Sequence, residues 1–275
     1  MSKFAARIHI LLASDAPIGL VIRRGPSKSV ATMLWNRRND TFELGQWLKG
    51  RIYERRSDLS PDGKQLIYFA LNGKWQSTVG GSWTAISRAP YLKAIALFAK
   101  GDGWHGGGIW TGTTSYWLND GYGHRVVYDT TSVRRDLKHP TVTDFGGECL
   151  GIYYPRLLRA GWKLIDRIPV AKWKHQDIFE KSIGKGWILR KIAHAAVGSP
   201  EGKGCYWDEH ELVHQQKNIV ITCPQWEWAE LDGDRLVWAE NGKLYTTNIK
   251  LSGLGHQVEL FDFNQMSFTP IEAPY

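Results

Sequence analysis

The chain has 275 residues, of which 43% are hydrophobic and 12% aromatic, and its formal net charge at pH 7 is +8. This composition excludes a disordered chain, and the length accommodates one large β domain or two ordinary domains. No apolar run approaches the roughly 20 residues of a membrane span, so we expect a soluble, cytoplasmic protein without membrane attachment. A disulfide framework or zinc ribbon is not expected, because no C-x-x-C spacing occurs among the cysteines, Cys149, Cys205 and Cys223.

Charge is distributed unevenly along the chain. Residues 1–133 carry 17 Lys and Arg against 9 Asp and Glu, residues 134–200 carry 13 against 6, and residues 201–275 carry 5 against 12. Such an asymmetry predicts either complementary packing between neighbouring elements or a positive face for an acidic partner. Nucleic acid is the second class of partner that a positive face attracts.

Short apolar and aromatic segments separated by Gly, Pro and Asn turns recur along the chain, which is typical of an all-β fold. The strands predicted before the middle of the chain cover residues 8–13, 18–23, 30–35, 41–47, 54–59, 66–71, 82–87, 92–98, 109–111, 115–118 and 125–128. The alanines of residues 92–98 leave a short helix open there. The strands predicted later cover residues 161–165, 186–190, 226–231, 236–239, 244–249 and 258–263. No long amphipathic helix and no linker is predicted.

One tight turn occurs twice. Pro61 pre-sets the first copy, Asp62 caps it, and Gly63 is expected to adopt a positive φ. The second copy contains Asp232 and Gly233, 170 positions further on. In each copy an apolar, β-favouring run follows the turn, so each copy predicts a hairpin.

Residues 59–68 resemble the turn motif in the blades of bacterial β-propellers of the TolB/WD40-like class, and residues 232–238 resemble it more weakly. The resemblance implies a single propeller domain over residues 1–275, with blades that are four-stranded antiparallel sheets. A separation of 170 residues fits five blades of about 55 residues, or six of about 43. The grouping of the predicted strands favours five.

His210, Glu211 and His214 match the H-E-x-x-H pattern of zinc hydrolases. On a helix this pattern places two imidazoles one turn apart, with the glutamate as general base for a zinc-bound water. The same residues alternate acceptably as a strand, and the surroundings are β throughout. We therefore expect no cofactor and no catalytic zinc, with the zinc hydrolase kept as an alternative.

Two further patterns belong to hydrolases. Residues 105–108 read His-Gly-Gly-Gly, as in esterase oxyanion loops, but no G-x-S-x-G occurs, so a turn between blades is expected. A glycosidase-like site in the central channel would need converging carboxylates. The candidates are Asp58, Asp102, Asp144 and Glu148, and nothing in their spacing selects them.

Basic and aromatic residues interleave in two segments, residues 156–163 and 172–175, and such clusters can hold phosphates while Trp stacks on bases. The alternative for each segment is a solvated strand edge kept from pairing by its charges. Together with the glycine-rich loop, they give the predicted binding residues: Trp104, His105, Arg156, Arg159, Trp162, Lys172, Trp173 and Lys174.

The sequence thus predicts a non-catalytic, monomeric binding module that presents a basic face to an acidic protein partner, with nucleic acid as the second possibility. The alternative is a channel-centred hydrolase, either glycosidase-like or using Glu211 with His210 and His214. The position of exposed Trp and of acidic residues distinguishes the two classes.

Overall fold

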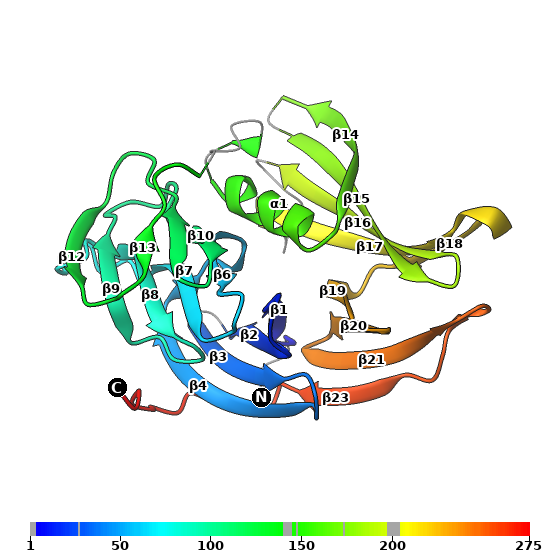
Figure 1. The fold of residues 1–275 in the computed structure, drawn as a ribbon, viewed down its shortest axis with the longest axis horizontal. Helices are drawn as coiled ribbons and strands as arrows, with labels where there is room; N and C mark the ends of the chain where they lie inside the picture. The colour runs from blue at the N-terminus through cyan, green and yellow to red at the C-terminus, as the bar shows by residue number, and fades with distance from the viewer. Residues whose placement is uncertain (1–3, 27, 140–144, 147, 173, 197–203) are drawn as a thin grey trace. The chain divides into compact units, whose positions relative to one another are not determined.

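The structure is a computed structural model that describes residues 4–26, 28–139, 145–146, 148–172, 174–196 and 204–275. In these residues the fold is all-β, with mainly antiparallel sheets and one α-helix, α1 (Leu150–Arg159) (Figure 1). The chain divides into two compact units. The first unit contains His9–Arg156 and Met266–Tyr275, and the second contains Leu157–Gln265 with Ala5–Ile8. The boundary therefore falls inside α1 and inside the first strand.

The first sheet is made of four neighbouring strands in chain order: β1 (Arg7–Leu12), β2 (Ile18–Arg24), β3 (Ser29–Asn36) and β4 (Thr41–Lys49). All four confirm strands predicted from the sequence. Their apolar residues form a common core with the second sheet, in which Leu20, Ile22 and Val30 pack with Leu66 and Tyr68.

The second sheet has the order β12-β9-β8-β7-β5, and β6 also pairs with β7. Its strands are β5 (Arg51–Ile52), β6 (Asp58–Leu59), β7 (Gln65–Leu71), β8 (Ser82–Arg88), β9 (Ala94–Ala99) and β12 (Arg125–Asp129). The helical alternative for residues 92–98 is wrong, since β9 pairs with β8 on one side and β12 on the other. The predicted strand over residues 54–59 is broken by a 3-10 turn, η1 (Glu54–Arg56).

Buried charge explains that break. Glu54 and Arg56 lie inside the first unit, and a short turn directs both side chains inward. Burial by itself would raise the pKa of Glu54, but Arg24 and Arg55 outweigh it and lower the pKa to about 2. The Arg24 guanidinium lies 3.0 Å from the Glu54 carboxylate. The carboxylate is therefore ionised although it is buried. In a regular strand, a buried position of this kind would hold an apolar residue.

The third sheet belongs to the first unit and joins β10 (Gly108–Gly112), β11 (Ser115–Leu118) and β13 (Arg134–Arg135). β13 runs parallel to β11, while the other pairing is antiparallel. Trp110, Tyr116 and Leu118 are buried and pack with Ile67 of the second sheet, which gives this part of the unit a second apolar core.

The fourth sheet is a five-stranded antiparallel meander in the second unit: β14 (Lys163–Ala171), β15 (Lys174–Gly184), β16 (Trp187–Ala196), β17 (Tyr206–His214) and β18 (Ile219–Cys223). A 3-10 turn, η3 (Gln215–Lys217), joins the last two strands. β15 and β18 were not predicted from the sequence. Residues 156–159, interpreted there as a strand edge, belong to α1, because Ile152, Tyr153, Tyr154 and Leu157 form one buried helix face.

The fifth sheet completes the second unit, and its strands confirm the four predicted over residues 226–263. Its order is β19-β20-β21-β22, with β23 also paired to β21. The strands are β19 (Trp226–Asp232), β20 (Arg235–Glu240), β21 (Lys243–Lys250), β22 (Gly253–Leu254) and β23 (Val258–Asp262). None of the described helices is long and apolar enough to pass through a bilayer.

The repeated turn has the predicted geometry in both copies. Gly63 has φ +75° and Gly233 has φ +63°. In the first copy the Asp62 carboxylate accepts hydrogen bonds from the Ser60 hydroxyl at 2.7 Å and from the Lys64 backbone N–H at 3.2 Å. The polar groups of the turn are thus hydrogen-bonded within the turn itself. The turn connects β6 to β7 in an antiparallel pair.

We expect Gly63→Val to lower stability more than Asp62→Ala. A Cβ at Gly63 would lie 2.8 Å from the Ile18 Cβ, and the positive φ is strained for a β-branched residue by about 1–3 kcal/mol. Asp62→Ala removes two partly exposed hydrogen bonds, each worth about 1 kcal/mol. Thermal unfolding of both variants measures the difference. Equal melting temperatures would contradict this account of the turn.

Candidate functional site

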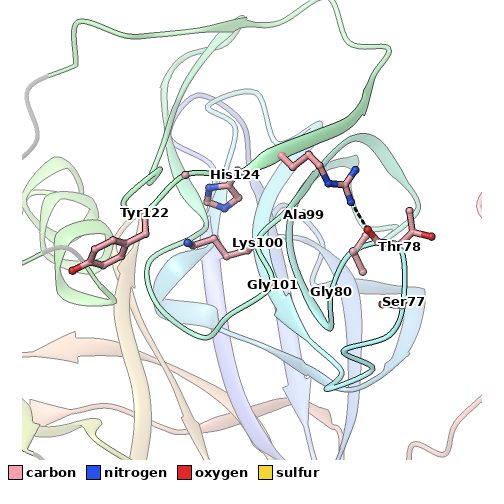
Figure 2. A pocket seen from close by; sticks show the side chains of 11 residues that line it. Ser77, Thr78, Gly80, Ala99, Lys100, Gly101, Tyr122 and His124 are labelled. Atoms are coloured by element: carbon pink, nitrogen blue, oxygen red, sulfur yellow. Dashed lines mark hydrogen bonds between the residues drawn. The ribbon is translucent and has the colours of Figure 1, made fainter.

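A polar pocket of about 520 Å³ opens in the first unit between three loops and the edge of the second sheet (Figure 2). The residues that line it are Ser77, Thr78, Val79, Gly80, Ala99, Lys100, Gly101, Tyr122, Gly123, His124 and Arg125. The titratable groups of this lining are basic or neutral, and no carboxylate belongs to it. A pocket of this kind favours an anionic group over a cation.

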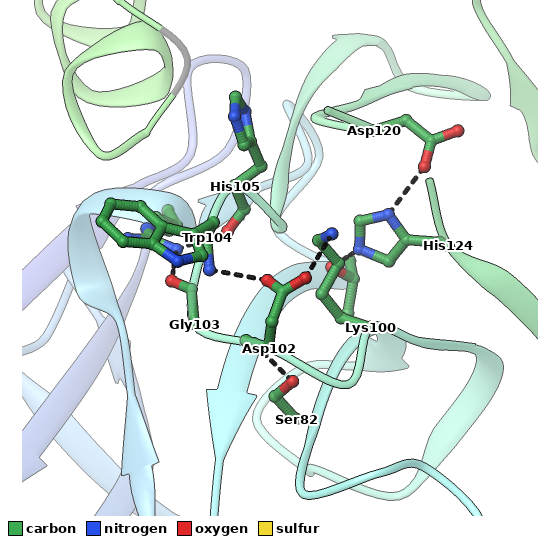
Figure 3. A network of polar contacts seen from close by, with 10 residues as sticks. Ser82, Lys100, Asp102, Gly103, Trp104, His105, Asp120 and His124 are labelled. Atoms are coloured by element: carbon green, nitrogen blue, oxygen red, sulfur yellow. Dashed lines mark hydrogen bonds and ion pairs between the residues drawn. The ribbon is translucent and has the colours of Figure 1, made fainter. Parts of the chain in front are cut away.

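The imidazole of His124 is held in one orientation at the pocket wall. Its Nε2 lies 3.0 Å from the Thr84 hydroxyl, and its Nδ1 lies 2.7 Å from an Asp120 carboxylate oxygen (Figure 3). The second Asp120 oxygen accepts a hydrogen bond from Arg135 at 2.6 Å, and Thr84 Oγ1 accepts one from the Gly107 N–H at 2.8 Å. Burial lowers the pKa of His124 although Asp120 opposes this.

These contacts indicate which atoms of His124, Thr84 and Asp120 carry the hydrogen-bonding protons. A neutral imidazole with its proton on Nδ1 donates to Asp120, and its Nε2 accepts from the Thr84 hydroxyl, which in turn accepts from Gly107. Hydroxyl, imidazole and carboxylate thus stand in the order used by serine hydrolases. Thr84, however, is 0% exposed, so its hydroxyl has no access to a substrate. The network fastens the loop that carries His124 to β8.

Lys100 supplies a buried positive charge beside this network. Its side chain is 0% exposed, and its ammonium lies 3.1 Å from the Asp102 carboxylate, which is 40% exposed (Figure 3). The same carboxylate accepts a hydrogen bond from the Trp104 N–H at 2.7 Å, and the Ser82 hydroxyl donates to the Asp102 carbonyl at 2.6 Å. Asp102 therefore orders the loop beside the pocket while it balances Lys100.

Arg125 differs from Lys100 because its charge is not balanced. Its guanidinium is exposed and donates to the Thr78 carbonyl oxygen (Figure 2). In the described part of the chain no carboxylate lies within ion-pair distance of Arg125. A backbone carbonyl orients the guanidinium without neutralising it, so this cation remains available to an incoming anion.

The predicted binding residues Trp104 and His105 lie in the loop that adjoins the pocket wall. Trp104 is 63% exposed and Tyr122 is 85% exposed. The His105 ring packs edge-on against Tyr122 with 5.0 Å between ring centroids. Gly106 and Gly107, by contrast, are buried, and the chain there hydrogen-bonds to Asn119, so the expected simple turn between blades is a packed segment.

Arg156 and Trp162, two other predicted binding residues, are part of the interior. The Arg156 guanidinium donates to the backbone carbonyls of Glu54 and Ser57 and lies 3.7 Å from Asp58. Trp162 is 2% exposed, and its indole N–H donates to Glu230 at 2.7 Å. Their basic and aromatic character serves packing within each unit. The sequence could not reveal this, because the partners are far away along the chain.

Arg159 is the last residue of α1, Lys172 follows the end of β14 and Lys174 is the first residue of β15, while Trp173 lies outside the described residues. Arg159 and Lys172 are exposed, and Lys174 is partly exposed. The solvated strand edge considered for these two segments is therefore not where the sequence placed it, because residues 156–159 are helical and residues 174–175 lie on β15, an inner strand. These three cations belong to a different unit from the pocket.

The H-E-x-x-H residues lie on β17, not on a helix. His210 Nε2 is 2.9 Å from the Lys191 ammonium, and its Nδ1 is 3.1 Å from the Trp226 carbonyl. Glu211 forms an ion pair with Arg190 at 3.1 Å, and His214 packs against Trp187. Both nitrogens of His210 are thus occupied by protein groups, and no group of three potential metal ligands occurs among the described residues.

The carboxylates considered for a glycosidase-like site each contact a different partner. Asp58 accepts a hydrogen bond from the Trp110 N–H at 2.8 Å, Asp102 pairs with Lys100, and Glu148 lies 3.4 Å from Arg56. Asp144 lies outside the described residues. Each described acid has its own cation or N–H donor, which gives no support to a paired acid and base.

Comparison with known proteins adds little. No family model matches the chain, and no curated protein matches it. Among solved structures, the apo form of the isopeptidase AtxE2 is similar, with 12% sequence identity and a TM-score of 0.34. The similarity covers 94% of this chain and 53% of that one, so this chain spans about half the length of that protein. At this TM-score the likeness assigns neither a fold nor an activity.

Proposed function

We propose that this protein is a non-catalytic binding module whose pocket in the first unit takes an acidic group of a protein partner. The observation that carries the proposal is the pocket lining, which holds Lys100, His124 and Arg125 and no carboxylate. Arg125 supplies the free charge, whereas the charge of Lys100 is balanced by Asp102. Exposed Trp104 and Tyr122 offer apolar contact beside that charge, as partner-binding surfaces do.

We further propose that the five sheets of the described residues are the five blades of the propeller expected from the sequence. Four of the sheets contain the antiparallel meander that a blade requires. The two copies of the repeated turn connect the strands of the hairpins β6–β7 and β19–β20. Six blades remain the alternative. A propeller presents loops on a rigid platform, which suits a module that binds macromolecules.

The hydrolase alternative receives less support from the same geometry. A triad-like order exists at Thr84, His124 and Asp120, but the hydroxyl is buried. Glu211 and His210 are occupied by Arg190 and Lys191 on a strand. A binding role needs none of these groups to be free.

We expect a fluorescent hexaglutamate peptide to bind the protein, and Arg125→Gln to weaken this binding about 10-fold, as loss of one charge-assisted contact should. Arg38→Gln is the matched control, since Arg38 is an exposed cation of the first unit outside the pocket. Raising the salt to 1 M should also weaken binding, because the Debye length falls to about 3 Å. Fluorescence polarisation measures all three.

Three results would count against the proposal. Equal loss in Arg125→Gln and Arg38→Gln would indicate general charge attraction without a site. Preference for a single-stranded oligonucleotide over hexaglutamate would favour a nucleic-acid partner. Turnover of a glycan or ester panel would favour the hydrolase.

A further inference from the structure

The fourth sheet has two edge strands, β14 and β18, and they differ in how they face solvent. β14 is exposed along most of its length and shows Ile165, Ile168 and Val170 to solvent. It also carries the charges of Lys163, Asp166 and Arg167, contains Pro169, and has two irregularities in its register with β15. Charges, proline and bulges are the devices by which proteins prevent an edge strand from pairing with another chain.

β18 has none of these devices. Its sequence, Ile-Val-Ile-Thr-Cys, contains no charge and no proline, and it pairs with β17 in continuous register from His210↔Cys223 to His214↔Ile219. The exposed fractions of Ile219, Val220 and Ile221 are 37%, 54% and 41%. In Figure 1, β18 is the yellow strand at the opposite end of the sheet from β14. It is the last strand in the order β14-β15-β16-β17-β18, so one of its edges faces away from the sheet.

Such an edge combines strong β propensity with exposed apolar side chains and an outer row of backbone groups that no described strand pairs with. β-Branched residues favour extended backbone, and a regular strand presents its outer N–H and C=O groups in the spacing that another strand needs. The contrast with β14 shows that the same sheet protects one edge and leaves the other open. We propose that β18 pairs with β18 of a second copy of this chain.

The choice of a second copy follows from the symmetry of the strand. Ile219-Val220-Ile221 reads the same in both directions, so an antiparallel pair centred on Val220 sets Ile219 of one copy against Ile221 of the other. Asn218, with φ +52°, and Lys217, in the 3-10 turn η3, precede the strand and lie outside this pairing. No two like charges meet, and the central pairs are all β-branched, which is the kind of cross-strand pair that stabilises a sheet. A two-fold axis makes this contact close on itself.

The dimer would be weak. One short strand pair buries less than the roughly 1,000 Å² that stable interfaces need, so we expect dissociation constants of about 10–100 μM. The proposal departs from the monomer expected from the sequence. It is also independent of the proposed function, because the pocket is in the first unit and β18 is in the second.

Sedimentation velocity over about 1–200 μM, a range that brackets weak association, tests the proposal. Wild-type protein should shift from monomer to dimer with concentration. Val220→Lys should remain monomeric, because two ammonium groups would meet at the axis. Ile168→Lys, which places the same charge on β14, should dimerise like the wild type. Far-UV circular dichroism checks that each variant is folded.

A second experiment detects the pairing directly and does not depend on the lysine variant. In a Cys205→Ser background, which removes the exposed native thiol, Val220→Cys should form a disulfide-linked dimer under mild oxidation. Ile168→Cys in the same background should do so at least 10-fold less. A wild-type monomer at every concentration, a dimer that persists in Val220→Lys, or equal cross-linking at both positions would overturn the proposal.

Discussion

Replacing Gly107 by alanine is expected to unfold the first unit or to lower its melting temperature by about 10 °C or more, the shift that about 4 kcal/mol produces in a domain of this size. Gly107 has φ +77°, and a Cβ built on it would lie 1.8 Å from the Arg56 carbonyl oxygen. No real contact is that short, so the backbone at one of the two residues would have to move.

Neither backbone can move freely. The Gly107 N–H donates to Thr84 Oγ1, and that bond starts the network that holds His124. On the other side, Arg56 donates from Nε to the Cys149 sulfur at 3.1 Å and from Nη1 to the Gly103 carbonyl at 2.8 Å. Relieving the clash would therefore break hydrogen bonds to buried groups, each of which is expensive to leave unmet.

Gly103 provides the matched control in the same loop. A Cβ there meets nothing within 4 Å, and its φ lies outside the left-handed region. We expect Gly103→Ala to change the melting temperature by no more than about 2 °C, because the added methyl group meets no neighbouring atom. Differential scanning calorimetry measures both variants. A Gly107→Ala protein as stable as Gly103→Ala would show that the loop packs differently.

Lys191→Met is expected to destabilise the second unit by about 3–5 kcal/mol, the usual cost of removing one partner from a buried ion pair. Lys191 on β16 is 1% exposed. Its ammonium lies 3.5 Å from the Asp208 carboxylate and 2.9 Å from His210 Nε2, and it stands over the Trp162 ring at 5.0 Å. Methionine keeps most of the volume but leaves a buried carboxylate without this cation.

Arg190→Met, one position away, is the control. Arg190 bonds Glu180 at 2.7 Å and Glu211 at 3.1 Å, but its side chain is 26% exposed, so its loss should cost about 1 kcal/mol. Adding Asp208→Asn to Lys191→Met should restore part of the loss, since it removes the carboxylate charge that faces Lys191. Urea unfolding gives the free energies. Equal destabilisation by Lys191→Met and Arg190→Met would contradict the buried pair.

Local sequence patterns predicted the parts of the fold that depend on neighbours in the chain. Short apolar runs bounded by turn residues predicted β1 to β4, β7, β8 and most strands of the fifth sheet, because extended propensity and turn chemistry act locally. The positive φ of Gly63 and Gly233 followed from turn chemistry for the same reason. A strand reading of residues 210–214 was available from alternation alone.

Local patterns did not predict the structure correctly where contacts with residues far away in the sequence determine it. Residues 156–159 carry charges at both ends and read as a solvated edge, yet they form part of α1 because its other face is buried. Arg156 and Lys191 look like surface cations in the sequence, but their partners, Asp58 and Asp208, lie on other elements and remove both from the surface. Composition therefore overestimated the basic face that is open to a partner.

The features of the candidate site also fall into those that the sequence predicts and those that only the structure shows. The sequence by itself determined an all-β chain, its hairpin turns, and a glycine-rich loop with Trp104 and His105 as binding candidates. Only the tertiary structure decided that Arg125 keeps a free charge beside that loop, and that β18 has an open edge while β14 is protected. The physical reason is that propensity and turn chemistry act over a few residues, whereas burial, ion pairing and strand neighbours depend on contacts between segments far apart in the chain.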